Sequence, residues 1–167
     1  MTLDDGTRRV INLVNLSTPL GLGLARLGRA EVVRHRRGLL LACGHRLPGP
    51  HRGAITVGDV VLLRAPASAV LAHDMDDHRL LDHEARHAVQ YAWCLGPVLI
   101  PMYLAACGWS WLRTGDWWSR NIFEQRAGLV DGGYVDRGTR RACRQAIASR
   151  GAAQPSTTTS LSVGNAP

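Results

Sequence analysis

The chain has 167 residues, of which 46% are hydrophobic and 20% charged, proportions that are typical of one soluble globular domain. They exclude a collagen-like, coiled-coil or wholly disordered chain. All 20 basic side chains are arginines, and the formal net charge is +7. Residues 1–136 hold 15 of these arginines against all 13 acidic residues, so the excess positive charge lies mostly in the tail. We therefore expect no specific nucleic-acid binding by the folded part.

The N-terminal residues lack the pattern of a secretory signal. Residues 4–9 pair two acids with two arginines, and the uncharged stretch Val10–Ala25 that follows contains asparagines and a proline. The cysteines show neither a C-x-x-C pair nor zinc-finger spacing, so we expect reduced thiols and a cytoplasmic location. They are Cys43, Cys94, Cys107 and Cys143.

The first 70 residues are predicted to form short extended segments that assemble into a small antiparallel sheet. The apolar run Gly38–Gly44 is bounded by glycines, as in a buried strand. Ala54–Leu63 is rich in β-branched residues and carries Gly58-Asp59 in its middle, which predicts either a hairpin or one kinked strand.

From residue 73 onward the pattern becomes helical. The acidic segment His73–His78 suits the start of a helix, where side-chain oxygens cap amide groups and negative charge favours the helix dipole. This helix continues to a Gly-Pro pair, whose proline suits the first turn of a second helix over about residues 97–112. Asp116 is predicted to cap a third helix over about residues 117–129, which ends before Gly132-Gly133.

The predicted fold is therefore α+β, with the sheet followed by a helical part that ends near residue 136. Residues 1–136 are expected to form a single domain. The tail, residues 137–167, begins as a basic segment with a short helical stripe and continues as the low-complexity run 155–160, which predicts disorder.

The segment His83-Glu84-Ala85-Arg86-His87 is an H-E-x-x-H motif, the sharpest signal in the chain. Two histidines four residues apart lie on one face of a helix, where both imidazoles reach one tetrahedral zinc ion. Glu84 lies at the edge of that face, where it can accept a proton from an activated water molecule and return it to a leaving amine. Composition alone predicts only about 0.005 such matches in this chain. The alternative is a solvated helix that carries two histidines by chance.

A zinc hydrolase needs a third protein ligand and one position open for water. In one class of zinc hydrolases the third ligand is a histidine six residues after the second histidine of the motif. This chain has Trp93 there, which excludes that class. The other solution is a glutamate on a later helix. Glu124 lies on the predicted third helix, with the small residues Ala127 and Gly128 one turn later, and is the expected ligand. The alternative is a surface glutamate paired with a neighbouring arginine. The reserve ligands are His73, His78 and Asp131.

The segment His83–Gln90, with Glu124 and Ala127 downstream, resembles the zincin metallopeptidases of the gluzincin type. The glutamine three residues after the second histidine is similar to the H-E-x-x-H-x-x-Q pattern of small bacterial peptidase-like domains of uncharacterised function. The resemblance covers roughly residues 77–130 and implies a zincin-like helical part with a zinc ion. By position it implies that His83, His87 and Glu124 bind the metal and that Glu84 is the general base.

The gluzincin pattern also includes residues after the third ligand. Gluzincin peptidases commonly carry an aspartate four residues later that orients a histidine, whereas this chain has Gly128 there and Asp131 as the nearest acid. They use a tyrosine or histidine to polarise the substrate carbonyl, and Tyr134 is the candidate here. In zincins an upstream strand runs beside the substrate, and Ala54–Leu63 is its counterpart.

Ala88–Leu112 is a stretch of 25 residues without a charge, long enough as one helix to cross a bilayer. Aromatic residues at both ends are arranged like the belts of membrane-spanning helices. A Gly-Pro pair and a second proline interrupt the stretch, so a bent, buried pair of helices packed on the metal site is preferred. Peripheral membrane contact through this stretch stays open.

Two functions follow from these patterns. The first is a zinc-dependent hydrolase, with a metallopeptidase as the preferred class, that acts on a protein or peptide substrate through a zinc-activated water and Glu84. The second is a non-catalytic, zinc-stabilised module that docks on a membrane or a protein partner. Glu84 distinguishes them, because a closed structural site has no use for a free carboxylate beside its first ligand.

Overall fold

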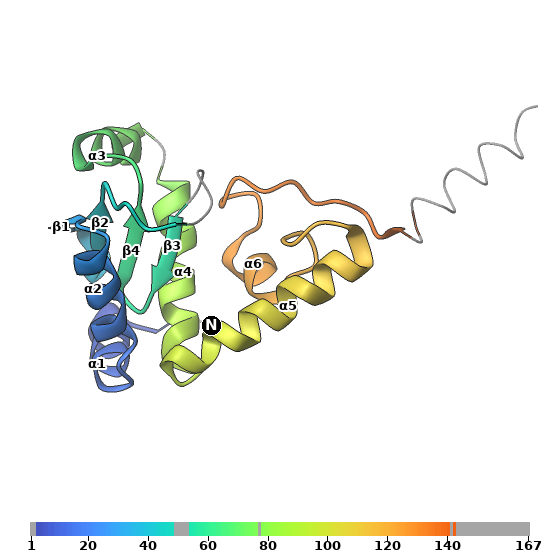
Figure 1. The fold of residues 1–167 in the computed structure, drawn as a ribbon, viewed down its shortest axis with the longest axis horizontal. Coiled ribbons are helices and arrows are strands. Elements are labelled where there is room, and N and C mark those ends of the chain that lie inside the picture. The colour runs from blue at the N-terminus through green and yellow to red at the C-terminus, as the bar shows by residue number, and fades with distance from the viewer. Residues whose placement is uncertain (1–2, 49–53, 77, 141, 143–167) are drawn as a thin grey trace, which may run out of the picture. The chain divides into compact units, whose positions relative to one another are not determined.

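The computed structural model describes residues 3–48, 54–76, 78–140 and 142. The chain divides into two units, Met1–Arg137 and Gly138–Pro167, and the first unit holds the elements labelled in Figure 1. Their bounds are α1 (Asp5–Val14), α2 (Ser17–Leu27), β1 (Glu31–Arg34), η1 (Arg36–Gly38), β2 (Leu40–Cys43), β3 (Ala54–Val57), β4 (Val60–Leu63), α3 (Ala67–Asp76), α4 (Arg79–Trp93), η2 (Gly96–Val98), α5 (Leu99–Thr114) and α6 (Ile122–Ala127).

The prediction of extended segments is wrong for residues 5–27, which form the helices α1 and α2. Asp4 caps α1, because its carboxylate accepts a hydrogen bond at 2.9 Å from an amide in the first turn. The spacing of apolar residues does not predict this helix because its buried face is polar. Arg8 and Asn12 point inward, while Val10, Leu13 and Val14 are exposed. The usual amphipathic pattern therefore runs in reverse.

The strands form one sheet in the order β1-β2-β4-β3, and the predicted α+β class is confirmed. β1 pairs with β2 in the antiparallel sense, and β3 and β4 form an antiparallel hairpin around Gly58-Asp59. The central strands β2 and β4 are parallel, so the sheet is mixed and not wholly antiparallel. The most apolar strands take the centre, where all four residues of β4 are buried, and β3 is left at an edge.

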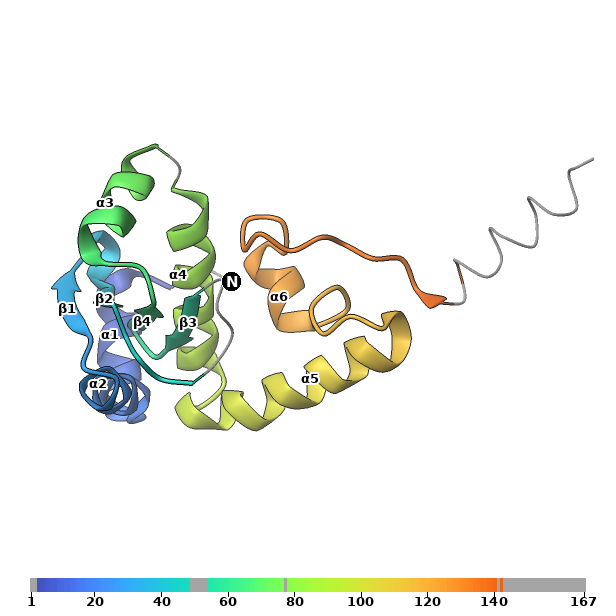
Figure 2. The same cartoon turned by 45° about the horizontal axis from the view of Figure 1, so that its top comes forward.

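The hydrophobic core lies on both faces of this sheet. Val61 of β4 belongs to a cluster with Val70 of α3 and Leu81 of α4. Its neighbour Leu62 belongs to a second cluster, which includes Ala25 of α2. Successive residues of a strand point to opposite faces, so both faces of β4 are covered. Figure 2 shows the arrangement of strands and helices from a second direction.

The helical second half departs from the prediction at the start of α4 and again at α6. Residues 73–76, expected to begin and cap the helix that carries the motif, instead end α3, and α4 begins only at Arg79, with no side-chain hydrogen bond from His78 to cap it. α4 carries the H-E-x-x-H motif, and α5 follows it after a bend of 109°.

α6 covers only Ile122–Ala127, not 117–129, and Asn121 caps it in place of Asp116. Asp116 instead accepts hydrogen bonds from two amides that follow it, which closes a turn. Gly128 ends α6 because it adopts a left-handed conformation, with φ 88°.

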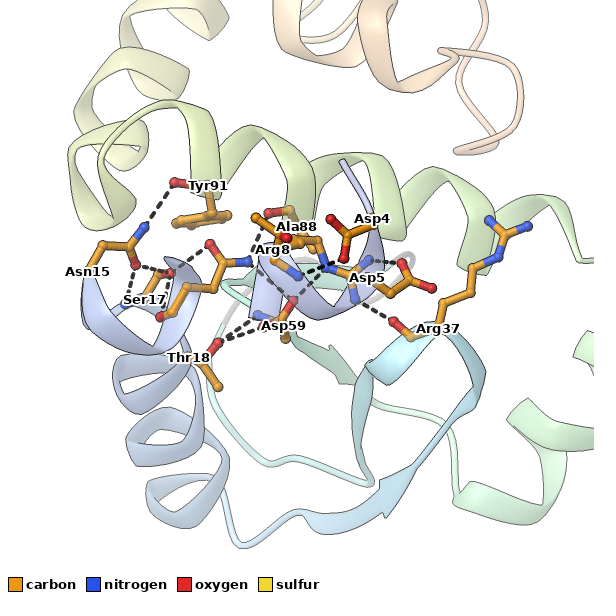
Figure 3. Close-up of polar contacts among 12 residues, drawn as sticks. Asp4, Asp5, Arg8, Asn15, Ser17, Thr18, Arg37, Asp59, Ala88 and Tyr91 are labelled. Atoms are coloured by element: carbon orange, nitrogen blue, oxygen red, sulfur yellow. Dashed lines mark hydrogen bonds and ion pairs between the residues drawn. The ribbon is translucent and has the colours of Figure 1, made fainter. Parts of the chain in front are cut away.

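A buried polar network ties the N-terminal helices to the β3–β4 turn and to α4 (Figure 3). Arg8 Nε and Asn12 Nδ2 both donate to Asp59 Oδ1, at 2.8 and 3.2 Å. The hydroxyl of Thr18 donates to Asp59 Oδ2 at 3.1 Å, and Asn12 Nδ2 also donates to the carbonyl of Ala88 at 2.9 Å. The network compensates two buried charges and holds the hairpin against α4.

Within the described residues no single helix has both the length and the apolar composition needed to cross a membrane. Two successive pairs of helices pass that test together, but each pair is sharply bent. The bend is 75° between α1 and α2, and 109° between α4 and the segment Gly96–Thr114. The uncharged stretch Ala88–Leu112 therefore contains the second bend, as expected. The expected burial is wrong for α5, which buries only Leu99, Cys107 and Ser110.

The cysteines that the structure describes, Cys43, Cys94 and Cys107, are free thiols, as expected. Cys143 and the low-complexity run at 155–160 lie outside the described residues. The predicted disorder of the tail stays a prediction.

Candidate metal centre

The three predicted metal ligands meet between α4 and α6, and we call them the metal trio. His83 and His87 lie one turn apart on α4, and their Nε2 atoms are 3.0 Å apart. Glu124 on α6 places Oε2 3.3 Å from His83 Nε2 and Oε1 3.5 Å from His87 Nε2. His83, His87 and Glu124 are 1%, 8% and 2% exposed. One ligand atom from each lies within 4.8 Å of the others.

Glu124 is positioned by its own short helix and by α5. Asn121 caps α6, so that Glu124 lies in its first turn. The hydroxyl of Tyr103 in α5 donates a hydrogen bond to Glu124 Oε1. The other oxygen, Oε2, is buried and finds no hydrogen-bond donor among the described residues. A buried carboxylate oxygen without a donor is costly unless a cation binds it.

The environment of His83 determines which ring nitrogen carries its proton. Nδ1 lies 3.1 Å from the carbonyl oxygen of Ala127 and 3.0 Å from that of Gly128. A carbonyl oxygen only accepts hydrogen bonds, so Nδ1 of the neutral ring holds the proton and Nε2 presents its lone pair. Gly128 stands where gluzincin peptidases have an orienting aspartate, and here the two backbone carbonyls orient the histidine.

A side-chain amide orients His87 in the same way. Gln90 Nε2 donates to the carbonyl of Phe123 at 2.8 Å, which leaves Gln90 Oε1 as the atom 2.9 Å from His87 Nδ1. This oxygen accepts a hydrogen bond from Nδ1–H, so Nε2 of His87 also presents a lone pair toward Glu124. Gln90 is the glutamine of the H-E-x-x-H-x-x-Q pattern, and its contacts give that position a physical role.

The spacing within the trio fits one tetrahedral cation. With metal–ligand bonds of about 2.0–2.2 Å, two ligands of a tetrahedral zinc site lie roughly 3.3 Å apart. The corresponding contacts here are 3.0, 3.3 and 3.5 Å. Since both neutral imidazoles hold their proton on Nδ1, no hydrogen atom lies between the converging lone pairs, and a cation bound there would supply the missing attraction. Two imidazoles and a carboxylate are a donor set for zinc and related divalent metals.

The pKa shifts within the trio also indicate a site for positive charge. Burial opposes ionisation of Glu124, but hydrogen bonds from the Nε2 atoms of His83 and His87, which form only when these nitrogens carry a proton, outweigh it and lower the pKa of Glu124 to about 2. Burial also opposes protonation of His87, but Glu124 and the charge of Glu84 raise its pKa above the ordinary value. Without a metal, a proton is the cation that balances the carboxylate.

Glu84, the predicted general base, is 4% exposed and lies beside His83 on α4. Its Oε2 accepts a hydrogen bond of 2.6 Å from the hydroxyl of Thr56. Thr56 belongs to β3, the edge strand, so this contact links the predicted substrate-side strand to the predicted base. The sequence carries no signal for it, because 28 positions separate the two residues and no helical or strand repeat relates them. Tyr103, in the middle of the uncharged stretch, was missed for the same reason.

The segment after α6 covers the other side of His83. A Cβ atom on Gly132 would lie 2.6 Å from His83 Cε1 and 2.7 Å from His83 Nε2, so only glycine fits. The ring of Tyr134 lies 6.3 Å from that of His83, centre to centre, and stacks on Trp118 at 5.1 Å. The predicted carbonyl-polarising residue is therefore next to the trio, in a half-buried aromatic pair.

The reserve ligands do not belong to the trio. His73 and His78 are exposed. Asp131 forms a salt bridge of 2.8 Å with Arg86, whose guanidinium also donates to the carbonyl of Ala127. Arg86 and Asp131 thus fasten the end of α6 to α4, and Arg86 shares the carbonyl of Ala127 with His83 Nδ1.

Comparison with known proteins adds nothing to this geometry: no protein-family model, no curated protein and no solved structure matches the chain.

Proposed function

We propose that this protein is a zinc-dependent hydrolase of the metallopeptidase class. The observation that carries the proposal is the convergence of two Nε2 lone pairs with a buried carboxylate oxygen that has no donor among the described residues. Zinc is the preferred metal because tetrahedral coordination by histidine and carboxylate ligands is its usual protein geometry. Glu84 adds the feature that a hydrolase needs beyond a metal, a second carboxylate next to the first ligand.

Each side chain near the trio has a role in this proposal. A zinc ion, when bound, acidifies a water molecule and polarises a substrate carbonyl. Glu84 accepts a proton from the attacking water and returns it to the leaving amine. Thr56 holds Oε2 of Glu84, which orients the carboxylate and leaves Oε1 for the proton. Burial and the charges of Glu124 and Glu84 raise the pKa of Tyr134, so its hydroxyl stays protonated and can donate to the substrate carbonyl.

A protein or peptide is the proposed substrate because of the position of β3. This strand is at the edge of the sheet, and an edge strand can pair with an extended peptide through its main-chain amide and carbonyl groups. Thr56 lies in β3 and bonds to Glu84, so a peptide paired with this edge would pass close to the general base. In zincins a strand upstream of the motif runs beside the substrate, and the position of β3 upstream of the motif, in contact with Glu84, supports the same substrate class.

The second candidate is a non-catalytic module in which zinc has a structural role. The burial of the trio favours it, since all three residues are less than a tenth exposed, as in a closed structural site. Under this proposal the metal joins α4 to α6, and Glu84 serves only as an acceptor for Thr56.

Elemental analysis of the purified protein tests the metal first. Close to one zinc per chain is expected, and His83→Ala or His87→Ala should abolish it. A folded wild type that retains no metal and does not respond to added zinc would overturn both candidates.

Glu84→Gln separates the two candidates, because it keeps the size of the side chain and removes the basic oxygen. Digestion of a peptide library, read by mass spectrometry, should show cleavage by the wild type. The variant should keep its zinc and lose roughly 10²–10⁴ in rate. Equal cleavage by the wild type and the variant would remove Glu84 as the general base, whereas no cleavage by the zinc-loaded wild type would remove the enzyme proposal and leave zinc with a structural role.

A further inference from the structure

Tyr103 links α5 to the metal trio through Glu124. Its hydroxyl donates the hydrogen bond to Glu124 Oε1, because an ionised carboxylate only accepts hydrogen bonds. The contact spans 21 positions of the chain and crosses from α5 to α6, two helices that lie against each other (Figure 1). α5 buries few side chains of its own, and this hydroxyl brings the helix into the site.

Aromatic packing fixes the direction of this hydroxyl. The ring of Tyr103 meets the ring of His87 edge to face, with centres 6.2 Å apart and planes at 78°. It also lies 6.1 Å, centre to centre, from the ring of Phe123, the residue before Glu124. Aromatic rings at these separations attract one another when they are tilted or edge to face. The ring therefore contacts one ligand and the neighbour of another, which holds the hydroxyl at Glu124.

The carboxylate of Glu124 faces both histidines at once. Oε2 lies 3.3 Å from His83 Nε2, and Oε1 lies 3.5 Å from His87 Nε2. Both oxygens are thus within reach of a cation placed between the imidazoles, and a carboxylate can bind a cation through one oxygen or through two. The difference matters because a catalytic zinc site has three protein ligands and a fourth position for water. A carboxylate bound through both oxygens would occupy that position.

The two oxygens of Glu124 differ in their hydrogen bonds. Oε1 accepts from Tyr103, whereas Oε2 is buried and has no donor within the described part of the chain. The hydrogen bond draws electron density from Oε1 and makes this oxygen the weaker of the two as a metal ligand. Partners that bond to a ligand in this way set its direction and its strength. Oε2 is therefore the oxygen left for the metal.

We propose that Tyr103 is a positioning residue that restricts Glu124 to one metal-binding oxygen and so keeps the fourth position of the site open for water. Tyr103 acts through Glu124 and does not touch the substrate. The inference rests on the metal site of the proposed function and deepens it, because an open fourth position is what a hydrolase needs and a closed structural site lacks.

Cobalt in place of zinc makes the fourth position observable. Cobalt(II) binds to histidine and carboxylate ligands as zinc does. Unlike zinc it absorbs visible light, and its bands shift when one of its ligands changes. Azide is the probe, because it is a small anion that replaces water on a metal. The full-length wild type loaded with cobalt should show a spectral shift on titration with azide, from which a dissociation constant is obtained.

Tyr103→Phe removes the hydroxyl and keeps the ring. Glu124 can then bind through both oxygens, and azide must displace one of them. The variant should keep its cobalt and bind azide at least tenfold more weakly than the wild type, since a hydrogen bond to a charged group is worth about that factor.

Tyr91→Phe is the matched control. It removes the hydroxyl of another buried tyrosine, on α4, and should bind azide as the wild type does. Circular dichroism verifies the fold of the wild type and of both variants.

Each outcome of the titration has a distinct meaning. Equal azide affinity in Tyr103→Phe and the wild type would overturn the inference and leave the proposed function standing. Loss of cobalt from a folded Tyr103→Phe would also overturn it, because Tyr103 would then hold the metal and not its open position. A wild type that binds cobalt but not azide would overturn the inference and favour a structural role for zinc. A wild type that binds neither zinc nor cobalt would overturn the proposed function as well.

Discussion

Gly132 is the position where a single methyl group tests the geometry of the metal trio. A Cβ atom there would lie 2.6 and 2.7 Å from two atoms of the His83 ring. Atoms in van der Waals contact are about 3.5–4.0 Å apart, so the ring or the chain must move by about 1 Å. Metal sites tolerate displacements of only about 0.2 Å. Gly132→Ala is therefore expected to lower zinc affinity by about 10- to 100-fold, the usual loss when a ligand is no longer held in place.

Gly133→Ala is the neighbouring control with the opposite properties. A Cβ atom on Gly133 meets no atom within 4 Å, but its φ of 80° is left-handed. Alanine there costs about 1–2 kcal/mol of folding free energy and leaves His83 untouched. We thus expect Gly132→Ala to lose zinc and Gly133→Ala to melt at a lower temperature while it keeps zinc.

Zinc affinity is measured by competition with a chromophoric chelator, and stability by thermal denaturation followed by circular dichroism. Both variants and the wild type are compared with and without a chelator. Wild-type zinc affinity in Gly132→Ala would refute the close approach of residue 132 to His83. Equal zinc loss in both variants would attribute the effect to general unfolding.

Three further predictions follow from contacts of the described residues. Glu124→Ala should release most of the zinc, whereas Glu31→Ala, on an exposed strand, should retain it by elemental analysis; equal retention would exclude Glu124 as a ligand. Thr56→Val removes the hydrogen bond to the proposed base and should lower kcat about tenfold with little change in KM, whereas Thr56→Ser keeps the hydroxyl and should keep the wild-type kcat. An unchanged kcat in Thr56→Val would remove Thr56 from the mechanism. Asp59→Ala leaves the Arg8 charge buried without its main partner and should cost about 3–5 kcal/mol in urea unfolding, and a cost below about 1 kcal/mol would contradict the network.

The grouping of His83, His87 and Glu124 was predictable because the pattern that indicates it is local and rare in this sequence. The i, i+4 spacing of His83 and His87 determines that they share a helix face, whatever the rest of the fold does. The chain has so few glutamates that the third ligand was a choice among a handful of residues. The resemblance to gluzincins gave the same set, and the structure brings these residues together.

Other features depended on parts of the chain that meet only in the folded state. The buried face of α1 is polar because Arg8 donates to Asp59, a residue of the β3–β4 turn. The sequence of α1 alone does not predict this contact. The parallel pairing of β2 with β4 depends on which apolar strands take the centre of the sheet.

The orientation of the ligands was also decided by tertiary structure. Local spacing places two imidazoles on one face but does not say which nitrogen carries the proton. The carbonyls of Ala127 and Gly128 decide that for His83, and Gln90, held by α6, decides it for His87. The sequence by itself determined which residues can bind a metal, because helical spacing is a local property. Only the packing of α6 and α5 on α4 turned their lone pairs toward one point, because hydrogen-bond partners distant in the chain set the direction of each ring.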